Sequence, residues 1–136
     1  MVLFSYPNAS ILELGGASGG VATKILTKRR GIFTDYTFAC PTEAIRGLAE
    51  ESLKPWSSSL KFLVDDISAK GRKKSEMQTY DIIIAPNALY GAESIEFGLV
   101  DLKRMLNPGG RLCLIETTKP GVQLSCALGC FQSWWR

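Results

Sequence analysis

Two periods of hydrophobic residues alternate along the chain. Short apolar runs, typical of buried strands, are separated by stretches in which apolar residues recur every three or four positions, as in helices. The apolar runs predict strands at about 9–14, within 32–38, and at 60–64, 82–85 and 111–115. The helical stretches predict helices at about 19–28, after Thr42 and after Ser94.

Strands that alternate with helices predict an α/β fold, which is a Rossmann-like, doubly wound sheet of about five strands. The run 82–85 (IIIA) is apolar at every position. A strand of this kind is covered on both faces, which is typical of a parallel sheet. The sheet is therefore expected to be mostly parallel.

Several residues mark where the predicted helices begin and end. Lys28-Arg29-Arg30-Gly31 places positive charge and a glycine at the end of the first helix, as a helix C-terminus prefers. Thr42 can cap the second helix, which should stop before Pro55. The apolar stripe of this second helix is expected to comprise Ile45, Leu48, Ala49 and Leu53.

The third helix should begin after Ser94 and be long. Its apolar residues recur at the spacing of one helix face, and they are Ile95, Leu99, Leu102 and Leu106. Asn107-Pro108-Gly109-Gly110 then predicts a stop and a turn before the strand at 111–115.

A glycine-rich run follows the first predicted strand directly. Residues 11–20 read ILELGGASGG, so an apolar strand ending in an acid leads into a glycine turn and then into a helix. Glycine allows a ligand to approach the backbone closely, and the helix N-terminus presents unpaired N–H groups. A nucleotide-like ligand is expected here. The alternative is a tight turn that binds nothing.

Spacing separates three possible ligands. A phosphate-binding P-loop needs a lysine and a hydroxyl after its last glycine, but Val21 and Ala22 follow Gly20, so this motif is excluded. A dinucleotide fingerprint fits with one defect, at Ala17. Glu13 favours the third ligand, S-adenosylmethionine, because an acid suits a cationic amino-acid group better than it suits a pyrophosphate.

Composition narrows the class of protein. The 136 residues suffice for one domain, and a net charge of +3 is too small to indicate a nucleic-acid partner. Four cysteines form no CxxC pair and histidine is absent, so no metal site is expected. The first residues lack the features of a signal peptide, and the apolar run 122–131 is too short to span a membrane. We expect a cytoplasmic protein with no membrane partner.

The carboxyl ends of the predicted strands should gather the binding residues, as in other doubly wound sheets. The residues at those ends are 15–19, 38–40, Asp66, 87–90 and Glu116.

These strand ends resemble those of the class I S-adenosylmethionine-dependent methyltransferases, and more narrowly the C-methyltransferase domain of fungal highly reducing polyketide synthases. The similar segments run in order through most of the chain. They are 11–20, Tyr36-Thr37-Phe38, Asp66-Ile67, 80–89 (YDIIIAPNAL), 106–112 (LNPGGRL), Glu116 and Trp134-Trp135. The resemblance implies that residues 1–136 form a single methyltransferase-like domain, as part of a larger synthase.

The resemblance also implies a role for individual residues. The backbone of the glycine turn would hold the amino-acid end of S-adenosylmethionine, through Gly15, Gly16, Ala17, Ser18 and Gly19 beside Glu13. Asp66 and the Ile67 amide would face the adenine, and Asn87 would lie beside the methyl group. In this family a histidine and a glutamate form the catalytic pair, and these positions fall on Tyr90 and Glu116.

The chain departs from the family pattern at three positions. Tyr90 replaces the catalytic histidine, and its ordinary pKa near 10 is high for a general base. Cys40 falls where the family has the acid that binds the ribose, and Glu43, or Asp35 if the register slips, could compensate. Ala17 replaces the central glycine.

The function implied by the resemblance is methyl transfer to the α-carbon of a β-ketoacyl chain. The partners would be an acyl carrier protein, which delivers the thioester, and neighbouring synthase domains. Two alternatives stay open, a pseudo-methyltransferase with a structural role and an NAD(P)-binding fragment.

Overall fold

The computed structural model describes residues 8–16, 19–28, 33–65, 78–89 and 94–117. The strands in these parts of the chain are β1 (Ala9–Leu14), β2 (Phe33–Cys40), β3 (Lys61–Val64), β4 (Tyr80–Pro86) and β5 (Leu106–Ile115). The helices are α1 (Gly20–Lys28), α2 (Glu43–Ser52) and α3 (Ile95–Arg104), with a 3-10 helix η2 at Lys54–Ser59.

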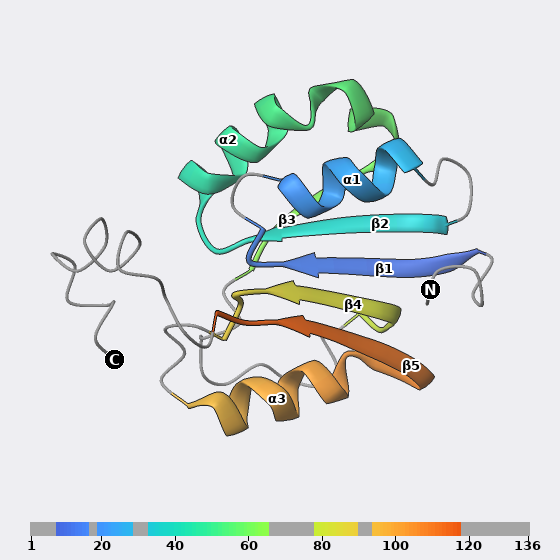
Figure 1. Cartoon of the computed structure of the whole chain (residues 1–136), viewed down its shortest axis with the longest axis vertical. Coiled ribbons are helices and arrows are strands. Elements are labelled where there is room, and N and C mark those ends of the chain that lie inside the picture. The colour runs from blue at the N-terminus through green and yellow to red at the C-terminus, as the bar shows by residue number, and fades with distance from the viewer. Residues whose placement is uncertain (1–7, 17–18, 29–32, 66–77, 90–93, 118–136) are drawn as a thin grey trace, which may run out of the picture.

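The strands form one parallel sheet in the order β3-β2-β1-β4-β5 (Figure 1). The chain runs outward from β1 to β3, and β4 then returns to the other side of β1. The sheet order therefore reverses between β1 and β4, where doubly wound sheets bind their ligands. The predicted α/β fold with a parallel sheet of about five strands is confirmed.

Helices cover both faces of the sheet. In Figure 1, α1 and α2 lie on one side and α3 lies on the other. Successive strand residues point to opposite faces, so each strand contributes to two cores. The first core contains Ile11, Phe38 and Ile82 with Leu26 of α1. The second contains Leu12 and Ile83 with Leu102 of α3, among others.

The apolar stripes of α2 and α3 differ from the predicted ones. In α2, Ala49 and the following Leu53 are buried and Ile45 is partly buried, but Leu48 is 71% exposed. Periodicity alone had placed Leu48 on the covered side. The stripe of residues that α2 buries against the sheet is therefore narrower than the predicted apolar stripe.

In α3 the buried residues are Gly98 and Leu102, while Ile95 and Leu99 are exposed. The Leu89 side chain packs against this face of α3, where it occupies the space that a Cβ at Gly98 would need. The helix ends at Arg104, so Leu106 belongs to β5 and not to the helix as predicted.

Asn107-Pro108-Gly109-Gly110 was predicted as a stop and a turn, yet these residues lie within β5. The pairing with β4 jumps from Tyr80↔Leu106 to Ile82↔Arg111, and Gly109 has a φ of +79°. The extra residues form a bulge that β5 absorbs. The turn residues therefore produce a local irregularity within β5 and do not separate the strand from what precedes it.

Candidate functional site

The carboxyl ends of the parallel strands meet at one edge of the sheet (Figure 1). The turn after β1 begins there with Gly15 and Gly16, β2 ends at Cys40, and Asn87 and Glu116 follow β4 and β5. The topology therefore brings together residues that are far apart in the sequence.

The described glycines of this turn, Gly15, Gly16 and Gly19, have no space for a side chain. Gly15 has a φ of +75°, and a Cβ there would lie 2.9 Å from the carbonyl oxygen of Pro86. Gly19 has a φ of +67°, and a Cβ there would lie 2.8 Å from Leu53. Glycine alone tolerates this backbone and these approaches at low cost. Gly19 N–H donates to the carbonyl of Gly16 at 2.8 Å, which closes the turn at the start of α1.

Glu13 is a fully buried carboxyl group beneath this turn. Its Oε2 accepts a hydrogen bond from the hydroxyl of Tyr36, which is buried as well. Its Oε1 has no hydrogen-bond partner among the described residues. Burial raises the pKa of Glu13 to about 7, while the Tyr36 hydroxyl and the backbone amide of Ala22 act to lower it.

Gly16 lies directly against this carboxyl group. A Cβ at position 16 would overlap Glu13 Oε1 and would also crowd the ring of Phe38. The free oxygen thus faces the backbone of the turn, close to the N-terminus of α1. A negative charge at this place would favour a cationic group bound nearby.

A second cluster joins the ends of β4 and β5. Asn87 has a φ of +51°, a left-handed conformation that asparagine tolerates, and its N–H donates to Ile115 O at 2.7 Å. Its side-chain Oδ1 accepts from the N–H and the hydroxyl of Thr117, at 3.0 and 3.1 Å. Asn87 is therefore held in one orientation at the strand ends.

Glu116 contacts the segment that leads to position 90. Its Oε1 accepts the backbone N–H of Leu89 at 3.0 Å. Tyr90, which the family resemblance pairs with Glu116, lies outside the described residues. Glu116 thus fixes the backbone next to that position.

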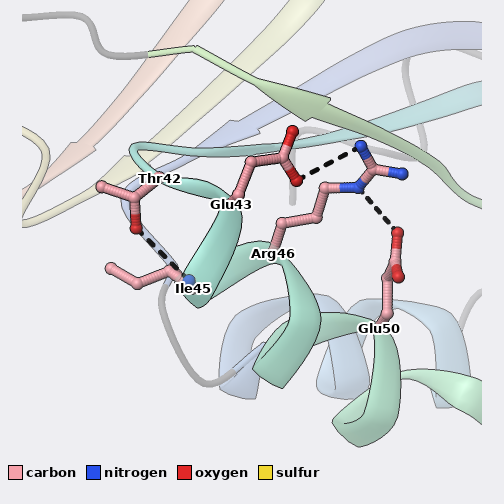
Figure 2. A network of polar contacts seen from close by, with 5 residues as sticks. All are labelled: Thr42, Glu43, Ile45, Arg46 and Glu50. Carbon is pink, nitrogen blue, oxygen red and sulfur yellow. Dashed lines mark hydrogen bonds and ion pairs between the residues drawn. The ribbon is translucent and has the colours of Figure 1, made fainter.

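The end of β2 lacks the expected acid. The Cys40 side chain is fully buried, and burial raises the pKa of its thiol. Glu43 lies three residues further on, in the first turn of α2, where Arg46 pairs with it at 3.6 Å and with Glu50 at 2.8 Å (Figure 2). Glu43 is therefore the acid nearest in sequence to the expected position.

Asp35 cannot take that position. It lies near the start of β2, opposite Ser10, and pairs with Lys61 at 2.6 Å. The suggestion that Asp35 could compensate for Cys40 is wrong, because the strand runs on for five residues before it reaches the binding edge.

Other predicted site residues fall outside the described parts of the chain, namely Ala17, Ser18, Asp66, Ile67 and Tyr90. Two residues had no predicted role and lie in the site, Tyr36 and Thr117. The strand alternation that puts Glu13 on the same face as Ile11 also puts Tyr36 there, since Tyr36 pairs with Ile11. Predicting that Tyr36 lies beside Glu13 would therefore have required the register of β1 and β2.

Within the described residues, no group of three or more His, Cys, Asp or Glu side chains could hold a metal ion. No helix in the same ranges has the length and apolar character needed to cross a membrane.

The parallel sheet, its strand order and the glycine turn after β1 define the Rossmann-like fold of class I methyltransferases. Solved structures share this fold. The CurJ carbon methyltransferase superimposes with a TM-score of 0.81 and 28% identity, over 96% of this chain and 35% of that one. The citrinin polyketide synthase CMeT domain gives 0.80 and 26%, over 93% and 33%. The trans-methyltransferase CalH, solved in complex with SAH, has a TM-score of 0.83 at 24% identity, which shows the fold alone.

Curated relatives are fungal synthases. The hybrid PKS-NRPS synthetase thnA of Trichoderma harzianum is 36% identical over 133 residues, which are 96% of this chain and 3% of the relative. The polyketide synthase-like protein Preu9 of Preussia isomera is 35% identical over 135 residues, 95% of this chain and 6% of the relative. No family model matches. The chain is thus related to a short segment of fungal polyketide synthases and has the fold of polyketide synthase carbon-methyltransferase domains.

Proposed function

We propose that the chain binds S-adenosylmethionine at the carboxyl edge of the sheet and transfers its methyl group to the α-carbon of a β-ketoacyl chain on an acyl carrier protein. One observation carries the proposal. A turn whose described glycines have no space for a side chain lies over a buried carboxyl group, one oxygen of which has no partner among the described residues. These residues suit a ligand that has a cationic amino-acid end.

The other residues at the edge would orient the reacting groups. Asn87, locked by Thr117, and Glu116, bonded to Leu89, lie at the ends of the two strands beyond the glycine turn. The cofactor supplies an electrophilic methyl group on a sulfonium. In the proposed reaction the α-proton goes to a base, the α-carbon forms the new C–C bond, and the C–S bond breaks. Alignment of the two partners supplies much of the rate in such reactions.

The proposed reaction needs a base that removes the α-proton. Tyr90 occupies the position of the family's histidine, and the 136 residues contain no histidine. Lowering a tyrosine pKa from about 10 to about 7 requires roughly 4 kcal/mol of differential stabilisation. This observation favours a second candidate, a pseudo-methyltransferase that keeps the fold and performs no methyl transfer.

Binding is tested first, by the thermal shift that S-adenosylhomocysteine produces. Saturation at about 100 times the dissociation constant should stabilise the fold by roughly 2.7 kcal/mol. A folded sample that shows no shift would contradict the proposed cofactor site. Tighter binding of NAD than of S-adenosylhomocysteine would replace the methyltransferase proposal by a dinucleotide-binding one.

Methyl transfer is tested separately, with a β-ketoacyl thioester and S-adenosylmethionine. We expect Tyr90→His to raise the rate and Glu116→Gln to lower it, while Glu51→Gln, at an exposed position on α2, should have no effect. Cofactor binding without methylation in both the parent and Tyr90→His would support the pseudo-methyltransferase. Equal rates in the two would show that Tyr90 is not the lesion.

A further inference from the structure

Tyr36 takes part in a buried contact that the proposed reaction leaves unexplained. Its hydroxyl donates to Glu13 Oε2, and both side chains are almost fully excluded from solvent. Tyr36 belongs to β2 and pairs with Ile11, two residues before Glu13, so its ring lies on the face covered by α1. A tyrosine from the neighbouring strand thus reaches the acid that precedes the glycine turn.

The carboxyl group is held at Oε2 by the Tyr36 hydroxyl, and the backbone amide of Ala22 lies near enough to lower its pKa. Oε1 has no hydrogen-bond partner among the described residues, and it lies against Gly16. Leaving a buried carboxylate oxygen without a donor is costly, because burial removes its water. A purely structural pair would be expected to satisfy both oxygens. Among the described residues, this oxygen is therefore available to a further donor on the side of the turn.

We propose that Tyr36 is a positioning residue of the cofactor site, which fixes Glu13 Oε2 so that Oε1 remains beneath the turn as acceptor for the ammonium group of the cofactor's amino-acid end. The inference rests on the proposed function, since it assumes that S-adenosylmethionine binds at this edge. Tyr36 acts through Glu13 and contacts no reacting atom.

The arrangement makes binding of the ammonium group depend on pH. Only the ionised Glu13 attracts a cation, and its pKa is raised to about 7 by burial. The affinity for a ligand with an ammonium group should therefore rise as the pH increases through about 7. Without the Tyr36 hydroxyl, which lowers the pKa of Glu13, the same rise should occur at higher pH.

Among the described residues, the other ionisable groups on the elements around this pair are exposed, engaged or buried elsewhere. On α1, Lys24 and Lys28 are exposed, and on β2, Asp35 pairs with Lys61. Further groups are likewise engaged or buried: Asp81 of β4 bonds to Ser10 and Asn107, Arg46 of α2 pairs with Glu43 and Glu50, and the Cys40 thiol is buried with a raised pKa.

The test compares Tyr36→Phe with Tyr80→Phe. Tyr80 is an equally buried tyrosine on β4, but it belongs to the other core, so the same substitution there controls for lost packing and polarity. Affinities are measured by calorimetry between about pH 6 and pH 9 for two probes. S-adenosylhomocysteine carries the ammonium group, and 5′-methylthioadenosine lacks the amino-acid end altogether.

We expect Tyr36→Phe to weaken S-adenosylhomocysteine binding near pH 7.5 by about 10-fold, the effect of one charge-assisted hydrogen bond. Its affinity should also rise at higher pH than in the parent. Binding of 5′-methylthioadenosine should be unchanged and independent of pH, and Tyr80→Phe should behave as the parent does. Glu13→Gln, which has no charge to titrate, should abolish the pH dependence.

Different results would overturn the proposed cofactor site and the proposed role of Tyr36. If neither probe binds the folded parent, the cofactor site itself is absent. If both probes bind but Tyr36→Phe weakens them equally, or leaves the pH profile in place, Tyr36 has only a structural role and the inference is overturned.

Discussion

At the scale of single residues, Glu13 links stability to pH. Its carboxyl group has a pKa of about 7 in the folded chain, against an ordinary value of 4.5. Between these values the folded chain retains a proton that the unfolded chain has released. The contribution of this group to stability is therefore fully present below about pH 4.5, and it is lost as the pH rises through about 7.

We predict that the parent loses about 3 kcal/mol of unfolding free energy relative to Glu13→Gln between pH 4.5 and pH 8. The glutamine variant keeps the shape and the contact with Tyr36 but cannot ionise. Urea unfolding at several pH values measures the difference, in which the other titrating groups cancel. Parallel profiles for the two proteins would mean that Glu13 does not carry a raised pKa.

Asp81 has the opposite behaviour at the other end of the sheet. Its Oδ2 accepts from the N–H and hydroxyl of Ser10, both at 2.9 Å, and its Oδ1 accepts from Asn107 at 2.8 Å. These hydrogen bonds lower the pKa of Asp81 below its ordinary value of 3.8. The stability they contribute is present above that value and is lost as the pH falls through the lowered one.

Because Asp81 joins β1, β4 and β5, we predict that Asp81→Ala destabilises the fold by about 2–3 kcal/mol at pH 7. The control is Asp101→Ala on α3, which breaks only an ion pair with Arg104 three residues away and should cost less than about 0.5 kcal/mol. Chemical denaturation gives both values. Similar losses in the two variants would contradict the role of the Asp81 hydrogen bonds.

At the scale of elements, the glycine turn can be probed without changing a charge. Gly16 lies where a Cβ would overlap Glu13, whereas Gly47, inside α2, has nothing within 4 Å of an added Cβ. Gly16→Ala should therefore destabilise the fold by about 1–3 kcal/mol. Gly47→Ala should stabilise it by about 0.5–1 kcal/mol, since alanine favours the helix.

Thermal and urea unfolding of the two alanine variants provide the measurement. The opposite signs are the decisive feature, because both substitutions add the same methyl group. If Gly16→Ala were as stable as the parent, the turn would have enough freedom to move away from Glu13.

Periodicity predicted well the features that depend only on residues close together in the sequence. The apolar run of β4 and the helix start at Ser94, whose hydroxyl accepts from Phe97 N–H, are local signals. The face that a helix buries is not local. Gly98 is buried beside Leu89, which belongs to another segment, and no pattern within α3 contains that information.

The candidate site shows the same division. Strand ends can be read from a sequence, so Gly15, Asn87 and Glu116 were correctly expected at the edge of the sheet. The Tyr36–Glu13 contact depends on the register of two strands that lie more than twenty residues apart in sequence. The register also excludes Asp35 as the ribose-binding acid, because it places this residue near the start of β2.

At the scale of the whole molecule, the sheet order explains why residues that follow four different strands lie at one edge of the sheet. The chain leaves β1 in one direction and returns beside it with β4, so the glycine turn lies next to the segment after β4. Gly15 indeed approaches Pro86 and Ala88 closely. The chain spans about a third of the length of the solved methyltransferase chains that it matches.

The outer surface of α3 carries several exposed large apolar side chains. Phe97 and Val100, three residues apart and so on the same side, are 68% and 45% exposed. Contiguous exposed apolar groups promote association between molecules. We predict that the 136-residue chain associates increasingly with concentration, and that the double variant Phe97→Lys, Val100→Lys reduces this association.

The matched control is Leu48→Lys on α2. Leu48 is 71% exposed, as open as Phe97, but no exposed large apolar residue accompanies it on that helix. Sedimentation velocity over a range of concentrations should show a lower average mass for the α3 variant and no change for Leu48→Lys. Because none of the three positions is buried, the urea midpoints should stay close to that of the parent. Equal effects of the two variants would show that added charge, and not the apolar side of α3, governs association.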